Sequence, residues 1–308
     1  MPDYPTQRDL WWRIAILCTF LAAAFTTAKS FASGEDLSLG PAPVQRSSSS
    51  LPSLDFGQRV FQNISAIQRK LLSDDFTVQE ATDPLLIAWS LEAQPQYYQN
   101  HHADGSLGYV QIKSVATFDL GIPVFTRLEW APFEVDDTTG PMKAGVGDLT
   151  YLILPILEDS EKWGRLGVGP VFVFPTASHP EMGQQAYQVG PAFGWSNRHL
   201  EGWQFAILGQ EFLSYAGSNK RTGVNQFQLQ PFVFRYLPDD WYLATQPNMT
   251  IDFEKNTSEI PVNFTIGKLF SHKLHMSVQT NAYPYWTNTP KHNWDLRLSV
   301  SYIFRSPL

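Results

Sequence analysis

The stretch NWDLRLSVSYIF, residues 293–304, alternates between apolar and polar side chains. In a β-strand successive side chains point to opposite faces, so this segment would carry one apolar face and one face of charges, amides and hydroxyls, broken only by Ile303. A soluble sandwich would bury the apolar face against a second sheet. A transmembrane barrel would turn the same face to lipid and keep the polar face for its lumen. The rest of the chain has to decide between the two.

Composition narrows the class of protein. Of the 308 residues, 17% are charged and 14% are aromatic, with ten Trp, whereas soluble proteins have roughly 25% charged residues. This balance favours a membrane-facing or strongly aromatic β protein. The net charge is -7, and Lys and Arg are scattered singly along the chain, so we expect no nucleic-acid partner.

The N-terminal residues have the pattern of an export signal. The apolar run IAILCTFLAAAF, residues 14–25, is shorter than the roughly 18 residues that a spanning helix needs. It follows Arg8 and Arg13 and precedes small residues at Ser30 and Ala32, which predicts a secretory signal over residues 1–32. An uncleaved anchor helix is the alternative. The only cysteine, Cys18, lies inside this segment, so the mature chain has no disulfide and no thiolate metal site.

Residues 33–80 form a second region. Residues 33–54 are rich in Ser, Pro and Gly, which predicts a linker. Apolar residues from Phe56 to Leu71 then recur at spacings of three and four, which predicts a short amphipathic helix. We expect this helix to lie at the periplasmic mouth of a barrel, to enter the lumen as a plug, or simply to pack on the surface.

From Pro84 onward the period changes to two. Most of the candidate strands reach the length of about 9 to 11 residues that a tilted membrane strand needs. Short and long links alternate between them, as tight periplasmic turns and longer outer loops do in outer-membrane barrels. Trp residues gather near the strand ends, where membrane interfaces favour them. The candidates are residues 85–96, 107–119, 123–133, 147–157, 163–175, 186–196, 202–214, 224–236, 240–253, 259–270, 273–285 and 293–304.

The predicted fold class is therefore all-β, a transmembrane antiparallel β-barrel of about 12 strands over residues 81–308, preceded by a short N-terminal helix. Its expected location is the bacterial outer membrane, with membrane lipids around it. A soluble periplasmic β-sandwich or barrel is the alternative. Prolines cannot donate to a strand ladder, so each one inside a candidate strand predicts a bulge or a local break in pairing. These are Pro132, Pro155, Pro170, Pro191, Pro231, Pro247 and Pro261.

Several segments resemble a known family. GVGDLTYLILPIL (145–157), RLGVGPVFVFPTAS (165–178), YQVGPAFGW (187–195), VNQFQLQPFVFRY (224–236) and IPVNFTIGKLF (260–270) are similar to the outer-membrane β-barrel family named for the meta-pathway of phenol degradation. The resemblance covers residues 81–304 and implies a transporter of small solutes, with hydrophobic and aromatic compounds as candidates. It implies no catalytic residue.

The alternation also predicts which polar side chains face the lumen. Charges there would either form ion pairs that fill the interior or build a constriction that selects solutes by charge. Because the last strand must close on the first, Glu92 and Arg297 are expected partners across that seam. The candidates for lining the lumen are Glu92, Arg127, Glu129, Arg165, Gln246, Asp252, Gln279, Asp295 and Arg297.

Two other chemistries, lipid hydrolysis and metal binding, are alternatives. His275, Ser277 and Asn281 could form the catalytic set of a lipid hydrolase, which needs its base within reach of the hydroxyl. Alternation places them in the lumen, away from lipid, so we expect no enzyme. A metal site would need three or four converging ligands. Its candidates are loop residues His101, His102, Asp104, His179 and Glu181.

We expect those loop side chains to be solvated instead, and we predict no metal and no cofactor. The sequence therefore predicts a channel or transporter for an unidentified small solute. A structural or adhesin-like barrel is the alternative.

Overall fold

The structure is a computed structural model that describes residues 76–86, 88–100, 105–137, 141–217, 223–287 and 292–304. The predicted signal at 1–32, the linker and the predicted helix at 56–72 lie outside the described residues. No helix among the described residues is long and apolar enough to cross a membrane.

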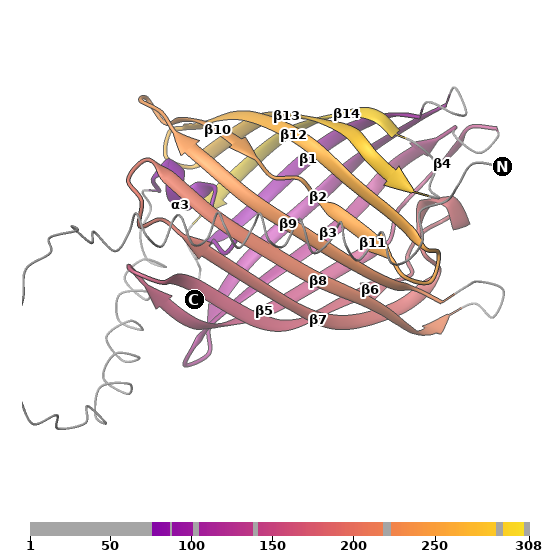
Figure 1. Ribbon diagram of the computed structural model, residues 1–308, viewed down its shortest axis with the longest axis horizontal. Coiled ribbons are helices and arrows are strands. Elements are labelled where there is room, and N and C mark those ends of the chain that lie inside the picture. The colour runs from indigo at the N-terminus through magenta and orange to yellow at the C-terminus, as the bar shows by residue number, and fades with distance from the viewer. Residues whose placement is uncertain are drawn as a thin grey trace, which may run out of the picture. The chain divides into compact units, whose positions relative to one another are not determined.

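The described strands form one closed antiparallel barrel (Figure 1). Of the fourteen strands in the sheet, β4 (Lys143–Gly145) only extends the outer end of one neighbour, and β10 and β11 occupy one position in the ring, which leaves twelve. The last strand pairs with the first and closes the ring. The predicted barrel and its strand number are confirmed. The ring consists of β1 (Trp89–Asn100), β2 (Ser106–Asp119), β3 (Pro123–Asp136), β5 (Leu149–Ser160), β6 (Gly164–Phe174), β7 (Ala186–Asn197), β8 (Trp203–Gly217), β9 (Asn225–Tyr236), β10 (Trp241–Thr245), β11 (Met249–Asp252), β12 (Thr257–Phe270), β13 (Leu274–Thr287) and β14 (His292–Phe304).

The alternation in residues 293–304 follows the wall of this barrel. Leu296 and Leu298 are 40% and 43% exposed on the outer surface, whereas Asp295 between two outward residues is fully buried. Ile303, which breaks the polar pattern, is also fully buried and belongs to an apolar cluster inside the barrel. The apolar face is thus the outer one and the polar face is the inner one, as predicted for a strand that meets lipid.

Aromatic side chains mark the end of the barrel where the turns are short. Trp163, Trp203 and Trp241 lie at or beside these turns. A cation lies over each indole ring, at 5.5 Å for Lys162 over Trp163, 5.2 Å for Arg235 over Trp203 and 5.1 Å for Lys268 over Trp241. Paired indoles and cations suit a boundary between lipid tails and headgroups.

Three prolines explain why one wall strand is split into β10 and β11. The register with β9 continues from Thr245 opposite Val233 to Met249 opposite Leu229, which places Pro231 opposite Pro247. On the other side, the register of β12 shifts at Pro261. Because none of the three prolines can donate a backbone hydrogen bond, the ladder breaks here as predicted.

Another pair of prolines did not shift the register as a bulge would. Pro170 and Pro191 lie directly opposite each other in an unbroken β6–β7 register. Each follows a glycine, and a Cβ at Gly190 would lie 1.8 Å from the carbonyl oxygen of Glu211. Neighbouring backbones therefore approach here more closely than any side chain would allow.

The predicted start of the first strand at residue 85 is wrong. Residues 76–86, called the plug segment below, instead form the short helix α3 (Val78–Ala81) and a turn inside one end of the barrel (Figure 1). The α3 helix begins with a capping box, in which the Thr77 hydroxyl accepts from the Glu80 amide and the Glu80 carboxylate accepts from the Thr77 amide. Leu85 and Leu86 are buried in one cluster with inward residues of β5 to β9, so burial overrides the strand pattern.

The outer face of β14 gives a test of the membrane placement. Leu298 stands in the middle of the strand and faces outward. Leu298→Arg should reduce the free energy of folding into lipid vesicles by about 2–4 kcal/mol, the cost of a cation at the bilayer midplane. The measurement is urea-dependent folding into vesicles.

Leu200→Arg is the matched control, because Leu200 is half exposed in a short turn outside the strands. It should leave the folding free energy almost unchanged. Equal losses in the two variants would contradict the proposed lipid contact of β14.

Candidate functional site

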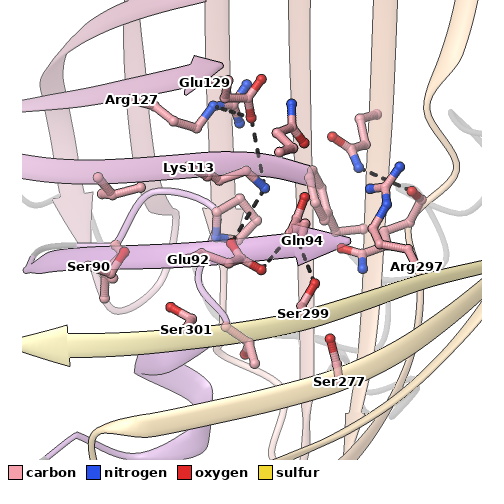
Figure 2. A pocket seen from close by; sticks show the side chains of 18 of the residues that line it. Ser90, Glu92, Gln94, Lys113, Arg127, Glu129, Ser277, Arg297, Ser299 and Ser301 are labelled. Atoms are coloured by element: carbon pink, nitrogen blue, oxygen red, sulfur yellow. Dashed lines mark hydrogen bonds and ion pairs between the residues drawn. The ribbon is translucent and has the colours of Figure 1, made fainter. Parts of the chain in front are cut away.

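A cavity of about 270 Å³ lies inside the barrel (Figure 2). Five residues of the plug segment form part of its lining, Ala81 to Pro84 and Leu86. Inward side chains of β1, β2, β3, β8, β9, β10, β13 and β14 form the rest, together with two residues of the β10–β11 break. The cavity is therefore a section of the lumen that the plug segment borders.

One wall of the cavity carries four charges. Glu92, Lys113 and Glu129 are direct cross-strand partners on β1, β2 and β3. The Lys113 Nζ lies 3.6 Å from the Glu92 carboxylate and 3.8 Å from the Glu129 carboxylate, while Arg127 Nε lies 3.1 Å from Glu129 (Figure 2). Two carboxylates and two cations thus alternate in space, and their charges cancel.

The opposite wall is formed by amides and rings. In the closed ring of twelve, β9 lies six positions from β2 in either direction, so the two strands face each other across the lumen. Gln228 and Gln230 of β9 line the cavity, and further along the same face Phe232 and Phe234 line it too. The two rings stack with centroids 6.3 Å apart and planes 10° apart. A solute in the cavity would therefore meet charges on one side and amides or aromatic rings on the other.

Gln94 joins the charged wall to β14. Its amide nitrogen donates to Glu92 Oε1 at 2.7 Å and to the Ser299 hydroxyl at 3.1 Å (Figure 2). Its carbonyl oxygen Oε1 is buried and accepts no hydrogen bond from the described residues. A buried acceptor without a partner thus lies beside the charged cluster.

The nine residues predicted to line the lumen fall into two groups. Glu92, Arg127, Glu129, Gln246 and Arg297 line the cavity itself. The remaining four are buried elsewhere inside the barrel, where they hold turns, the plug segment or a polar network: Arg165, Asp252, Gln279 and Asp295.

The predicted partnership of Glu92 and Arg297 is wrong. In the β1–β14 register, Glu92 lies opposite Ser301 and Arg297 lies opposite Gln96. The partner of Glu92 is Lys113, which is not among the nine residues predicted to line the lumen. The alternation of β2 places Lys113 inward, but its partners follow only from the strand register.

A polar network surrounds the β14 residue Asp295. Its carboxylate accepts hydrogen bonds from the Asn281 amide at 2.6 Å and from the Tyr283 hydroxyl. Gln279 donates to Asn281 at 3.0 Å and accepts from Gln246 at 2.8 Å. A fully buried carboxylate needs such donors, so this network holds the wall together.

The plug segment is anchored by a buried arginine. The guanidinium of Arg165 on β6 donates to Asp83 at 2.9 Å, to the carbonyl oxygen of Leu85 at 2.6 Å and to Asp159 at 3.1 Å. The Thr82 hydroxyl lies 2.7 Å from that of Tyr236 on β9. The plug segment is therefore held from two separate sides of the wall.

The hydrolase alternative finds no matching geometry. Nε2 of His275 lies 2.7 Å from the Tyr242 hydroxyl, and the Asn281 amide donates to Asp295. Ser277 lines the cavity and so faces the lumen, away from lipid. The imidazole and the amide are engaged elsewhere than with the serine that the mechanism needs.

The candidates for a loop metal site lie partly within the described residues. His101, His102 and Asp104 lie outside the described residues. Among the residues that are described, no group of three or more His, Cys, Asp or Glu is placed to hold a metal ion. Glu181 instead accepts from Lys143 Nζ at 2.6 Å, a hydrogen bond that lowers the pKa of its carboxyl group.

Comparisons with known proteins give a likeness of fold. No protein-family model and no curated protein sequence matches the chain. The structure of an outer-membrane channel from Pseudomonas putida F1 is similar, with 15% sequence identity and a TM-score of 0.58. The alignment covers 70% of this chain and 96% of the channel. The NanC and KdgM porins are each 11% identical, with TM-scores of 0.47 and 0.43. Their alignments each cover 70% of this chain and 99% of the porin chain. The fold is thus that of outer-membrane barrels, and the resemblance to the phenol-pathway family stays a prediction.

The anchor of the plug segment can be tested by substitution. Arg165→Met would leave the buried Asp83 carboxylate without its main partner, and such a change costs about 3–5 kcal/mol. We expect the amides of residues 76–86 to lose protection in hydrogen-exchange mass spectrometry.

Arg198→Met is the control. Arg198 Nε lies 3.9 Å from Asp83, and the Arg198 side chain is 24% exposed, so its loss should cost less than about 1 kcal/mol. If hydrogen exchange of the plug segment were the same in wild type and in Arg165→Met, the buried pair would not be its anchor.

Proposed function

We propose that this protein passes small solutes across the bacterial outer membrane through the lumen of its barrel. The observation that carries the proposal is the polar cavity inside the barrel, lined by charges and amides on opposite walls. A barrel with a purely structural task has no need of an interior space beside a charged wall. The outward apolar faces of the strands support a surrounding of membrane lipids.

The walls suggest what kind of solute fits. Phe232, Phe234 and Tyr242 contribute apolar ring surface to the lining, while Lys113 and Glu129 offer charges to a polar group. The solutes proposed are therefore small compounds that combine a hydrophobic or aromatic part with a polar part. Rings favour flat apolar groups, and buried charges reward a group that can pair with them.

The plug segment is proposed as a gate. It lines one side of the cavity and is held by Arg165 and Tyr236. Its buried apolar side chains pack against the inner wall, so a solute can leave on that side only when the segment shifts. The protein would then alternate between a closed lumen, with the plug segment in place, and a conducting one.

Filling the cavity should block transport. Gln230 lines the lumen, whereas its neighbour Leu229 points to the other face of β9. Gln230→Trp should reduce the swelling rate of proteoliposomes in a small solute such as glycine at least about tenfold, because the indole occupies the space that a solute would cross.

Leu229→Trp is the matched control and should swell like wild type, since the new ring would face lipid. An equal swelling rate for all three proteins would mean that solutes do not pass through this cavity. No swelling with any of them would favour the structural or adhesin-like alternative.

Releasing the gate should have the opposite effect. Arg165→Met removes the main anchor of the plug segment, so we expect a several-fold higher mean conductance in planar bilayers than for wild type. Arg198→Met should stay close to wild type. A gate held by Arg165 would be contradicted if the conductance of Arg165→Met did not rise while its hydrogen exchange did.

A further inference from the structure

The charged wall has an arrangement that a simple set of ion pairs does not require. The order along β1, β2 and β3 is negative, positive, negative, with Arg127 beside the last carboxylate. The cluster therefore attracts neither anions nor cations as a class. A ligand that carries one charge of each sign could pair with both kinds of group at once.

The contacts of Lys113 leave room for such a ligand. Its Nζ lies 3.6 Å and 3.8 Å from the two carboxylates. Both distances exceed the length of about 2.7–2.9 Å that is usual for a charge-assisted hydrogen bond. An ammonium group has three donors, and each carboxylate accepts several hydrogen bonds. Both signs of charge thus keep unused hydrogen-bonding capacity toward the cavity.

One buried atom supports a ligand independently of the charges. Gln94 is 5% exposed and lines the cavity. Its carbonyl oxygen Oε1 is buried without a hydrogen-bond partner in the described part of the chain. Buried polar atoms are normally paired. The Gln94 oxygen therefore needs a donor.

The opposite wall determines the rest of the ligand. Phe232 and Phe234 present stacked rings, and Tyr242 packs with its ring centroid 5.7 Å from that of Phe234. All three line the cavity across from the charged wall. An apolar side chain would lie against these rings while its charged end reached β1 to β3.

We infer that the cavity binds a small zwitterion with an apolar side chain, of the α-amino-acid type. The ligand's ammonium group would lie at Glu92 and Gln94 Oε1, and its carboxylate at Lys113 and Arg127. The apolar side chain would lie toward Phe232. This inference rests on the proposed function for its biological meaning, but binding can be measured without transport.

Three probes that share one ring separate the two charges. L-phenylalanine carries both, 3-phenylpropanoate lacks the ammonium group and 2-phenylethylamine lacks the carboxylate. Equilibrium dialysis of each radiolabelled probe against the full-length protein in detergent should give phenylalanine the highest affinity, by at least about tenfold, the loss expected of one charge-assisted hydrogen bond. Equal binding of all three probes, preference for a singly charged probe, or no binding would each overturn the inference.

Two variants should shift the preference in opposite directions. Lys113→Met should weaken phenylalanine and 3-phenylpropanoate at least about tenfold and leave 2-phenylethylamine as tight or tighter. Glu92→Gln should weaken phenylalanine and 2-phenylethylamine while sparing 3-phenylpropanoate. A merely structural role would weaken all three probes together, so a uniform loss would count against the inference.

The Lys143–Glu181 pair supplies matched controls, because it joins two loop-side residues that do not line the cavity. Lys143→Met and Glu181→Gln should bind all three probes like wild type. Heat-dependent gel migration and circular dichroism would verify that each variant is folded before dialysis.

Transport is then measured separately with the same probes in proteoliposomes. Binding of phenylalanine without any flux would overturn the proposed channel and leave the binding site standing. Flux of glycine without the predicted binding preference for phenylalanine would overturn the binding site and leave the proposed channel standing.

Discussion

Closure of β14 on β1 is the constraint on which this structure depends. In lipid no water is present to satisfy backbone amides and carbonyls, so a sheet can cross a membrane only when every strand has two neighbours. Closure then fixes which side of each strand is wet. The exposed Leu298 and the buried Asp295 are consequences of one geometric requirement, applied three residues apart.

The inside of the barrel is not uniform, and this asymmetry gives the candidate site its character. Strands β5 to β9 contribute many of the residues in the apolar cluster that packs around the plug segment, while β1 to β3 contribute the charged wall. A small cavity between an apolar and a charged surface can orient a molecule that has both kinds of group. Orientation, rather than width alone, is what distinguishes such a site from an open pore.

Period-two alternation was sufficient to predict the barrel, its strand number and the inward direction of residues such as Glu92 and Arg297. It was not sufficient for contacts, because these depend on register. The β1–β14 register places Ser301, not Arg297, opposite Glu92. In the sequence, residues 85–88 continue an apolar run into β1, yet Leu85 and Leu86 are buried inside the barrel. There Arg165 pairs with the neighbouring Asp83, and the two leucines pack against the apolar inner wall. The unpartnered oxygen of Gln94 has no sequence signal at all.

The pairing of Trp89 with Phe304 joins residues that stand at opposite ends of the barrel sequence. Until the thirteen residues of β14 arrive, the sheet has two free edges and an apolar face with no lipid against it, and both features promote aggregation. Contacts between such distant residues also form slowly, because a long loop must close before they gain anything. The newly exported chain would therefore need protection from aggregation for longer than its individual hairpins take to form. Loss of the last strand would leave an aggregation-prone open sheet rather than a smaller barrel.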